Sequence, residues 1–76
     1  MTIKNLVVGE SGIVVSVGGE KFLRHRLLEM GITPQTKITI KKIAPLGNPM
    51  EIIVRDYVLT LRKEDAARIT IVKIMS

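Results

Sequence analysis

A chain of 76 residues has room for one small core, so we expect residues 1–76 to form a single domain. It has no cysteine, which excludes disulfides and thiolate metal sites, and its single phenylalanine and single tyrosine leave an aliphatic core. The net charge of +5 comes from bases spread between acids, a pattern typical of a solvated surface. We find no signal peptide and no apolar run that could cross a bilayer, and therefore expect a cytoplasmic protein.

Turn-forming residues and the spacing of apolar residues define the first elements of the chain. Residues 2–6 fit one capped helical turn, and residues 13–17 are mostly β-branched, which predicts a strand. Leucines recur at helical spacing over residues 20–30, so we expect an amphipathic helix there. Gly31 then stands where a left-handed helix cap is favoured.

A turn at Pro34 leads into a second predicted strand over residues 36–43. Apolar and polar residues alternate along it until Lys42 falls in the apolar phase. A bulge or strand end near Lys41 and Lys42 would restore the alternation.

The loop over residues 44–49 should be stiff. Pro45 and Pro49 fix two backbone angles, while Gly47 permits the reversal of direction. Leu46 lies at its centre, and two interpretations remain open for it: an exposed anchor for another protein, or a lid over its own barrel.

Strands are predicted over residues 50–54, 57–61 and 69–72, with a short helical turn over residues 63–67. Two residues join the first two of these strands as a hairpin, in which we expect Asp56 to take the left-handed position.

These elements predict a mainly β fold, a small SH3-like barrel of five to six strands with one helix inserted after the first strand and a short closing helical turn. The main alternative is a ferredoxin-like α+β sandwich. That fold needs a second long helix, which residues 63–67 are too short to supply.

Other chemistry has weaker support. His25 and Glu29 are four residues apart on the predicted helix and are weak candidates for a ferrous iron site, but a metal site normally needs three or four ligands. No nucleophile stands beside a base and no nucleotide-binding motif is present, so we expect neither catalysis nor a cofactor.

Three segments together resemble the FeoA family of small cytosolic ferrous iron transport proteins. They are RLLEMGITP at 26–34, IAPLGNP at 43–49 and VRDYVLTLRKEDAARI at 54–69. The resemblance implies an SH3-like fold and a non-enzymatic accessory role beside the membrane transporter FeoB, through its soluble G-protein domain, with recruitment to the inner face of the membrane.

The chain departs from the family pattern at three positions. Gln35 and Asp56 stand where the family usually has glycine, and Asn48 replaces a commoner Asp or Gly. Because glutamine adopts left-handed geometry less readily than glycine, we predict a type I turn at Pro34-Gln35. The loop around Asn48 is a place where partner choice would differ.

The partner-binding residues that we predict belong to two elements, the loop and the helix. In the loop, Leu46 is the anchor within its bracket of prolines and glycine. In the helix, Leu28 would touch the partner, and Arg24 and Arg26 would form its charged rim. We therefore expect docking through both. The full set is Arg24, Arg26, Leu28, Pro45, Leu46, Gly47 and Pro49.

Two alternative functions stay open, together with the possibility of a homo-oligomer. One is a metal-responsive regulatory SH3-like module, since similar domains end iron-dependent repressors. The other is a small barrel that binds nucleic acid, which the positive charge allows but the scarcity of aromatic residues disfavours.

Overall fold

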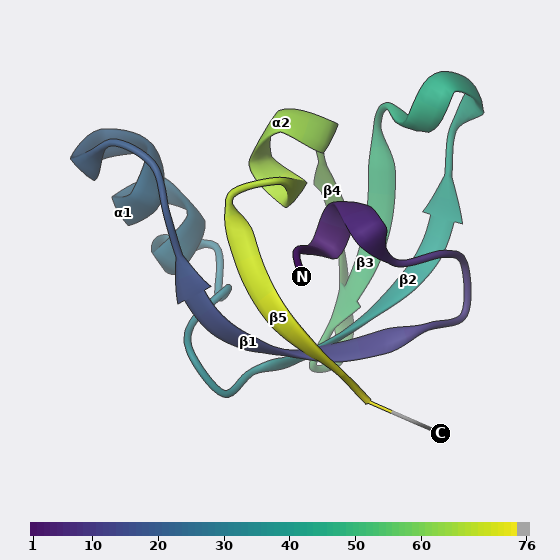
Figure 1. Ribbon diagram of the computed structural model, residues 1–76, viewed down its shortest axis with the longest axis horizontal. Coiled ribbons are helices and arrows are strands. Elements are labelled where there is room, and N and C mark those ends of the chain that lie inside the picture. The colour runs from purple at the N-terminus through teal and green to yellow at the C-terminus, as the bar shows by residue number, and fades with distance from the viewer. Residues whose placement is uncertain (75–76) are drawn as a thin grey trace.

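Five antiparallel strands form one strongly curved sheet in the computed structural model, which describes residues 1–74 (Figure 1). The strand order is β4-β3-β2-β1-β5. This confirms the predicted fold class, including the helix after the first strand and the short closing helix. In chain order the elements are η1 (Ile3–Asn5), β1 (Ser11–Val17), α1 (Lys21–Glu29), β2 (Lys37–Ile43), η2 (Pro45–Gly47), β3 (Met50–Val54), β4 (Tyr57–Leu61), α2 (Lys63–Ala66) and β5 (Ile69–Ile74).

Strand β1 is long enough to pair with two neighbours and bends between them. Its first residues pair with β2, while its whole length pairs with β5. The register of the β1–β5 ladder shifts between Val14 and Ser16. A second shift in the β2–β3 ladder, between Ile40 and Lys42, confirms the bulge predicted there. Such bulges raise the local twist, which lets a five-stranded sheet curl round a small core.

The core is aliphatic, as the composition indicated. Alternate residues of the strands point inward, and α1 contributes Leu27, which is fully buried. Met30 packs against this core while remaining partly exposed. The buried apolar residues are Ile3, Leu6, Val14, Leu27, Ile32, Ile38, Ile40, Met50, Ile52, Val54, Leu61, Ala66, Ile69 and Ile71.

Gly31 ends α1 in the left-handed conformation that was predicted, with φ of 99°. The hydroxyl of Tyr57 donates a hydrogen bond of 2.5 Å to the carbonyl oxygen of Met30. A Cβ at Gly31 would overlap that hydroxyl oxygen. Glycine is therefore required here both for its backbone angle and for the close approach of β4 to the end of α1.

The predicted type I turn at Pro34-Gln35 is wrong. Gln35 has φ of 73°, and the Thr36 N–H donates to the Thr33 carbonyl at 3.1 Å, which together describe a type II turn. Two further hydrogen bonds explain it. The Gln35 N–H donates to the Val14 carbonyl at 2.7 Å, and the Val14 N–H donates to the Thr36 carbonyl at 2.9 Å. These bonds to β1 outweigh the local preference of glutamine.

The hairpin between β3 and β4 has the predicted two-residue connection, closed by pairing of Val54 with Tyr57. The left-handed residue in it is Arg55, with φ of 56°, and not Asp56 as predicted. Turns that match the twist of a hairpin need positive φ at the first central position. The position in the turn therefore decides the conformation, although Asp56 tolerates it better.

Candidate functional site

The loop between β2 and β3, residues 44–49, is named the Leu46 loop below. Its first four residues make a turn in which the Gly47 N–H donates to the Ala44 carbonyl at 2.9 Å. Pro45 occupies the second position and Leu46 the third, with φ of 68° and ψ of 11°. These angles fit a type II turn, where glycine or asparagine is the usual third residue. A leucine there bears a backbone strain of about 1–2 kcal/mol.

The side chain of Leu46 projects into solvent. It is 95% exposed, the most exposed of the large apolar side chains in residues 1–74. The interpretation of Leu46 as a lid over its own barrel is therefore wrong. Neither core packing nor backbone preference accounts for a leucine at this position.

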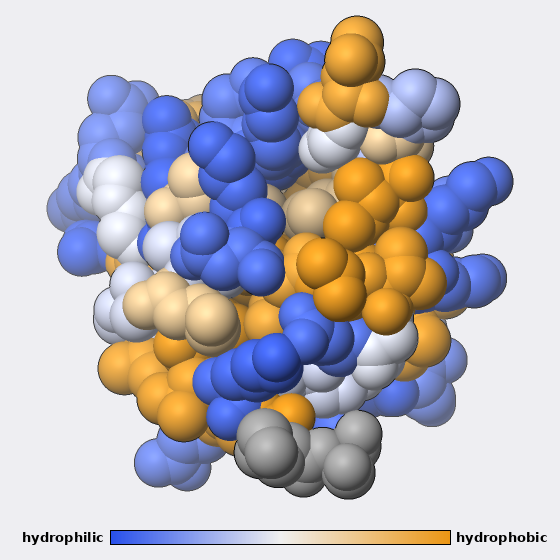
Figure 2. All heavy atoms as spheres, turned by 45° about the vertical axis from the view of Figure 1, so that its right-hand side comes forward, coloured by the Kyte–Doolittle hydropathy of each residue, from blue (hydrophilic) through white to orange (hydrophobic). Residues whose placement is uncertain are grey.

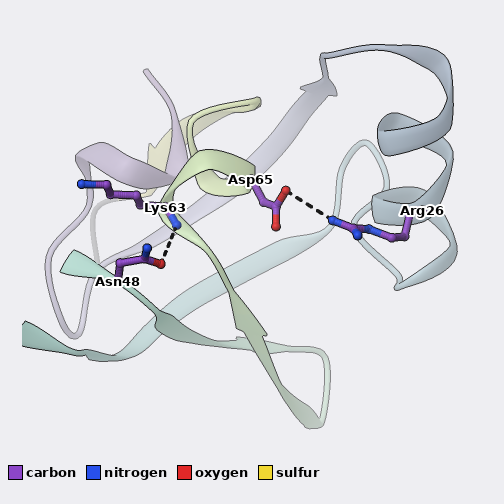
Figure 3. A network of polar contacts seen from close by, with 4 residues as sticks. All are labelled: Arg26, Asn48, Lys63 and Asp65. Atoms are coloured by element: carbon purple, nitrogen blue, oxygen red, sulfur yellow. Dashed lines mark hydrogen bonds and ion pairs between the residues drawn. The ribbon is translucent and has the colours of Figure 1, made fainter. Parts of the chain in front are cut away.

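Hydrogen bonds hold the base of the Leu46 loop. The Ala44 N–H donates to the Pro49 carbonyl at 3.0 Å and closes the loop. The side-chain oxygen of Asn48 accepts a hydrogen bond of 3.2 Å from the Lys63 N–H, at the start of α2 (Figure 3). Asn48 thus ties the loop to the closing helix, so the loop presents Leu46 on a fixed support.

The helix residues predicted to bind the same partner lie elsewhere. Figure 1 shows α1 on one side of the molecule and the Leu46 loop on the other, with α2 between them. Leu28 is partly buried, and Arg26 forms an ion pair of 3.5 Å with Asp65 of α2 (Figure 3). Arg24 is exposed. The structure therefore brings Pro45, Leu46, Gly47 and Pro49 together but does not join them to the helix residues.

His25 and Glu29 form an exposed pair on α1, with 2.8 Å between Nε2 and Oε1. Both side chains are about two-thirds exposed or more, at 67% and 71%. Among the described residues, no group of three or more His, Cys, Asp or Glu side chains is placed to hold a metal ion. The pair thus makes an i, i+4 contact on a wet helix face.

Sequence reasoning missed an exposed apolar pair on the side of the molecule that carries the loop. Val7 and Val8, in the turn after η1, are each more than half exposed. The Gly9 N–H donates to the Ile40 carbonyl at 2.8 Å, which seats this turn against β2. Figure 2 shows hydrophobic residues gathered on the side of the molecule that carries the Leu46 loop and this turn. The sequence signal that could have indicated this exposed pair is two adjacent valines directly before a turn-forming glycine.

Glu10 fixes the shape of that turn. Its carboxylate accepts a hydrogen bond of 2.8 Å from the Val7 N–H and pairs with Lys73 of β5. The hydrogen bond from Lys73 and then that from Val7 hold the pKa of Glu10 below its ordinary value of 4.5. The two valines are therefore displayed by a turn whose closing group is a carboxylate.

Sequence reasoning also missed Phe22 of α1, which is 74% exposed. Its helix, α1, lies on the side of the molecule opposite the Leu46 loop (Figure 1). In the described part of the chain no helix has the length and apolar character needed to cross a membrane.

A protein-family model described as the FeoA domain matches residues 1–73. The chain belongs to the FeoA family. FeoA proteins are non-catalytic accessory proteins of ferrous iron transport, in agreement with the expectation that this chain is not an enzyme.

One FeoA relative is joined to a transporter. It is an Fe(2+) transport protein A/Fe(2+) transporter FeoB fusion protein of Porphyromonas gingivalis, 38% identical to this chain over 76 residues. The match covers 100% of this chain and 9% of the length of the fusion protein.

Solved FeoA structures share the fold. The solution structure of FeoA from Chlorobium tepidum is 32% identical, has a TM-score of 0.90, and is matched over 99% of this chain and 71% of its own. Stenotrophomonas maltophilia FeoA, solved as a zinc complex and described as a prokaryotic SH3 domain protein, is 25% identical with a TM-score of 0.81. That match covers 93% of this chain and 88% of the other. The fold is thus the SH3-like fold of FeoA proteins.

Proposed function

We propose that this chain is an accessory protein of ferrous iron uptake that docks on the soluble G-protein domain of a FeoB-type transporter and modulates its assembly or activity. The fusion relative carries the proposal, because it places a domain 38% identical to this one in a single chain with FeoB. Joining two domains in one chain raises their effective concentration for each other. We infer that the present chain makes the same association in the cytoplasm, at the inner face of the membrane.

The Leu46 loop supplies the anchor of this contact. Burying an exposed leucine removes its apolar surface from water, which stabilises a complex by about 1.5–3 kcal/mol. Because the turn and the Asn48 hydrogen bond already order the loop, little conformational entropy is lost on docking. Pro45, Gly47 and Pro49 act by holding the leucine in place.

Val7 and Val8 extend the docking surface. The turn that carries them lies on the same side of the molecule as the loop (Figure 1), and hydrophobic residues gather on that side (Figure 2). A central apolar anchor beside further apolar residues is the usual arrangement of a protein interface. We assign α1 no part in this contact, since Leu28 is partly buried and Arg26 is paired within the molecule.

The test is a binding titration of the purified soluble domain of FeoB against this chain and two matched variants. Leu46→Asp should lower the affinity at least about thirtyfold, the loss expected of an interface anchor of about 2 kcal/mol. Phe22→Asp, which changes another exposed apolar residue, on α1 at the opposite side of the molecule, should bind as the unchanged chain does.

Both variants should keep the circular dichroism spectrum of the folded protein, since neither side chain is packed in the core. Full binding by Leu46→Asp would refute docking through the loop. Loss of binding in Phe22→Asp or Leu28→Asp alone would move the contact to α1.

A further inference from the structure

A groove of about 440 Å³ lies on the outer face of the sheet, at the end of β2 opposite the Leu46 loop. Its floor is formed by outward-facing residues of the β2–β3 ladder, Thr39 and Ile53, which are paired in register. The turn at Pro34 and the hairpin at Arg55 form its walls. Neither the family assignment nor the proposed docking surface uses this groove.

The charged side chains that line the groove are all cationic. Lys37 and Arg55 line it, and no carboxylate side chain does so among residues 1–74. Neither cation takes part in an ion pair within the same described residues. The Arg55 guanidinium is held near the end of α1, with Nη1 at 3.8 Å from where a Cβ would stand at Gly31. Two cationic side chains thus line the groove, and neither has an ion-pair partner in residues 1–74.

Hydroxyl groups supply further hydrogen-bond donors. Thr33 and Thr36 lie on one wall, with 2.8 Å between their hydroxyl oxygens. On the floor, the Thr39 hydroxyl is 2.7 Å from that of Ser11. A hydroxyl can rotate its proton from a neighbouring oxygen to a ligand, so these pairs keep each other satisfied when the groove is empty and can turn toward a ligand oxygen.

Gln35 completes the lining, and it does so in a strained backbone conformation. Its φ of 73° is one that glycine adopts without cost. Glycine at this position would form the same turn but would leave the groove without an amide N–H₂ donor. Strained backbone of this kind is concentrated at binding sites.

We propose that this groove binds phosphate or a phosphate monoester. A phosphate dianion matches the two unpaired cations in charge, and its oxygens suit the fork of an arginine and the hydroxyl and amide donors. The apolar surface of Ile53 and Pro34 leaves room for a small organic group on an ester. The site is independent of the docking contact, because β2 separates the two.

The experiment is a titration of the isotope-labelled chain with inorganic phosphate, followed by backbone amide shifts in NMR spectra at constant ionic strength set with chloride. Saturable shifts should be confined to residues 33–39 and 53–55. Lys37→Gln and Arg55→Gln should each weaken binding about tenfold, the loss of one charge-assisted contact. Lys41→Gln, an exposed lysine on the same strand outside the groove, should leave the affinity unchanged.

Gln35→Gly separates a binding role from a structural one. It should weaken phosphate binding while raising the melting temperature, since the backbone strain is relieved. A parallel titration with glycerol phosphate distinguishes the two sources of the anion. Tighter binding of the ester assigns the groove to phosphate monoesters, and equal binding assigns it to free phosphate.

Two results would overturn the proposal. One is a shift pattern that does not saturate or that spreads over basic residues throughout the surface. The other is equal weakening by Lys41→Gln and Lys37→Gln, which would show attraction to general positive charge. Neither result bears on the FeoB contact, which the Leu46→Asp titration tests separately.

Discussion

Two turns of the same backbone design flank β2, and they carry opposite chemistry. Each has a proline in its second position, a left-handed third residue and a hydrogen bond between its first and fourth residues. Leu46 is the third residue at one end of the strand, and Gln35 is the third residue at the other. The first lies at an exposed apolar tip, and the second lines a polar groove.

Both turns hold a non-glycine residue in a strained, left-handed backbone conformation. Within residues 1–74, the non-glycine residues with positive φ are Gln35, Leu46 and Arg55. Leu46 belongs to the proposed docking loop, and the other two line the proposed anion groove. Glycine would relax each position, so backbone preference does not account for the side chains that stand there.

The largest effect that would sharpen this comparison is a crossed pattern of binding losses. Leu46→Asp should abolish most FeoB-domain binding and leave phosphate binding intact, whereas Gln35→Gly should weaken phosphate binding and leave FeoB-domain binding intact. Titrating both variants with both ligands measures this directly. A variant that weakened both ligands equally would show that the two turns form one coupled site.

The two turns should also differ in hydrogen exchange. The Gln35 N–H is bonded to β1, whereas the Gly47 N–H is bonded only within its own turn. Opening the first requires breaking a contact between the turn and β1, so Gln35 should be protected at least about tenfold more than Gly47. Amide exchange monitored by NMR gives both rates in one experiment. Equal rates would mean that the Leu46 loop is as firmly held as the groove.

Glycine replacements should stabilise the fold at both turns. Gln35→Gly and Leu46→Gly should each raise the free energy of unfolding by roughly 0.5–1 kcal/mol, the relieved strain less the entropy that glycine adds to the unfolded chain. Urea denaturation measures the change. Thr39→Gly, in the middle of β2, serves as the control and should lower stability. A loss of stability at either turn would show that its side chain supports the fold.

The smallest effect is a pH dependence of stability at the turn that carries Val7 and Val8, on the side of the Leu46 loop. Because Glu10 has a lowered pKa in the folded state, its contribution to stability is complete above 4.5 and is lost as the pH falls through the lowered value. Glu10→Gln should flatten this part of the pH profile of unfolding. Glu51→Gln, elsewhere on the sheet, is the comparison variant. An unchanged profile in Glu10→Gln would show that the pair with Lys73 does not stabilise the turn.

The spacing of apolar residues and the positions of glycine and proline predicted the strands, the helix and the β2 bulge. These features depend on residues that are near one another in the chain. The left-handed conformations of Gln35 and Arg55 were missed. Hydrogen bonds to Val14 determine the first, and the twist of paired strands determines the second. Both are tertiary effects that outweigh residue preference.

The candidate site was predicted in part. Leu46 was found because two prolines bracket it, but whether it was exposed depended on the packing of the whole barrel. The separation of α1 from the loop, and the pairing of Arg26 with Asp65, follow from where α2 lies. Val7 and Val8 escaped notice because valine is most often buried, so two adjacent valines do not by themselves indicate an exposed surface.

The base of the Leu46 loop and its tip are supported differently, because the hydrogen bond from Lys63 to Asn48 holds the base alone. The base is held by a side chain that reaches α2, while the tip contacts little of the barrel. Residue 46 can therefore be replaced with little cost to folding, and a single substitution there would change the proposed docking surface without disturbing its support. The position proposed as the docking anchor is thus one whose side chain the fold itself does not need.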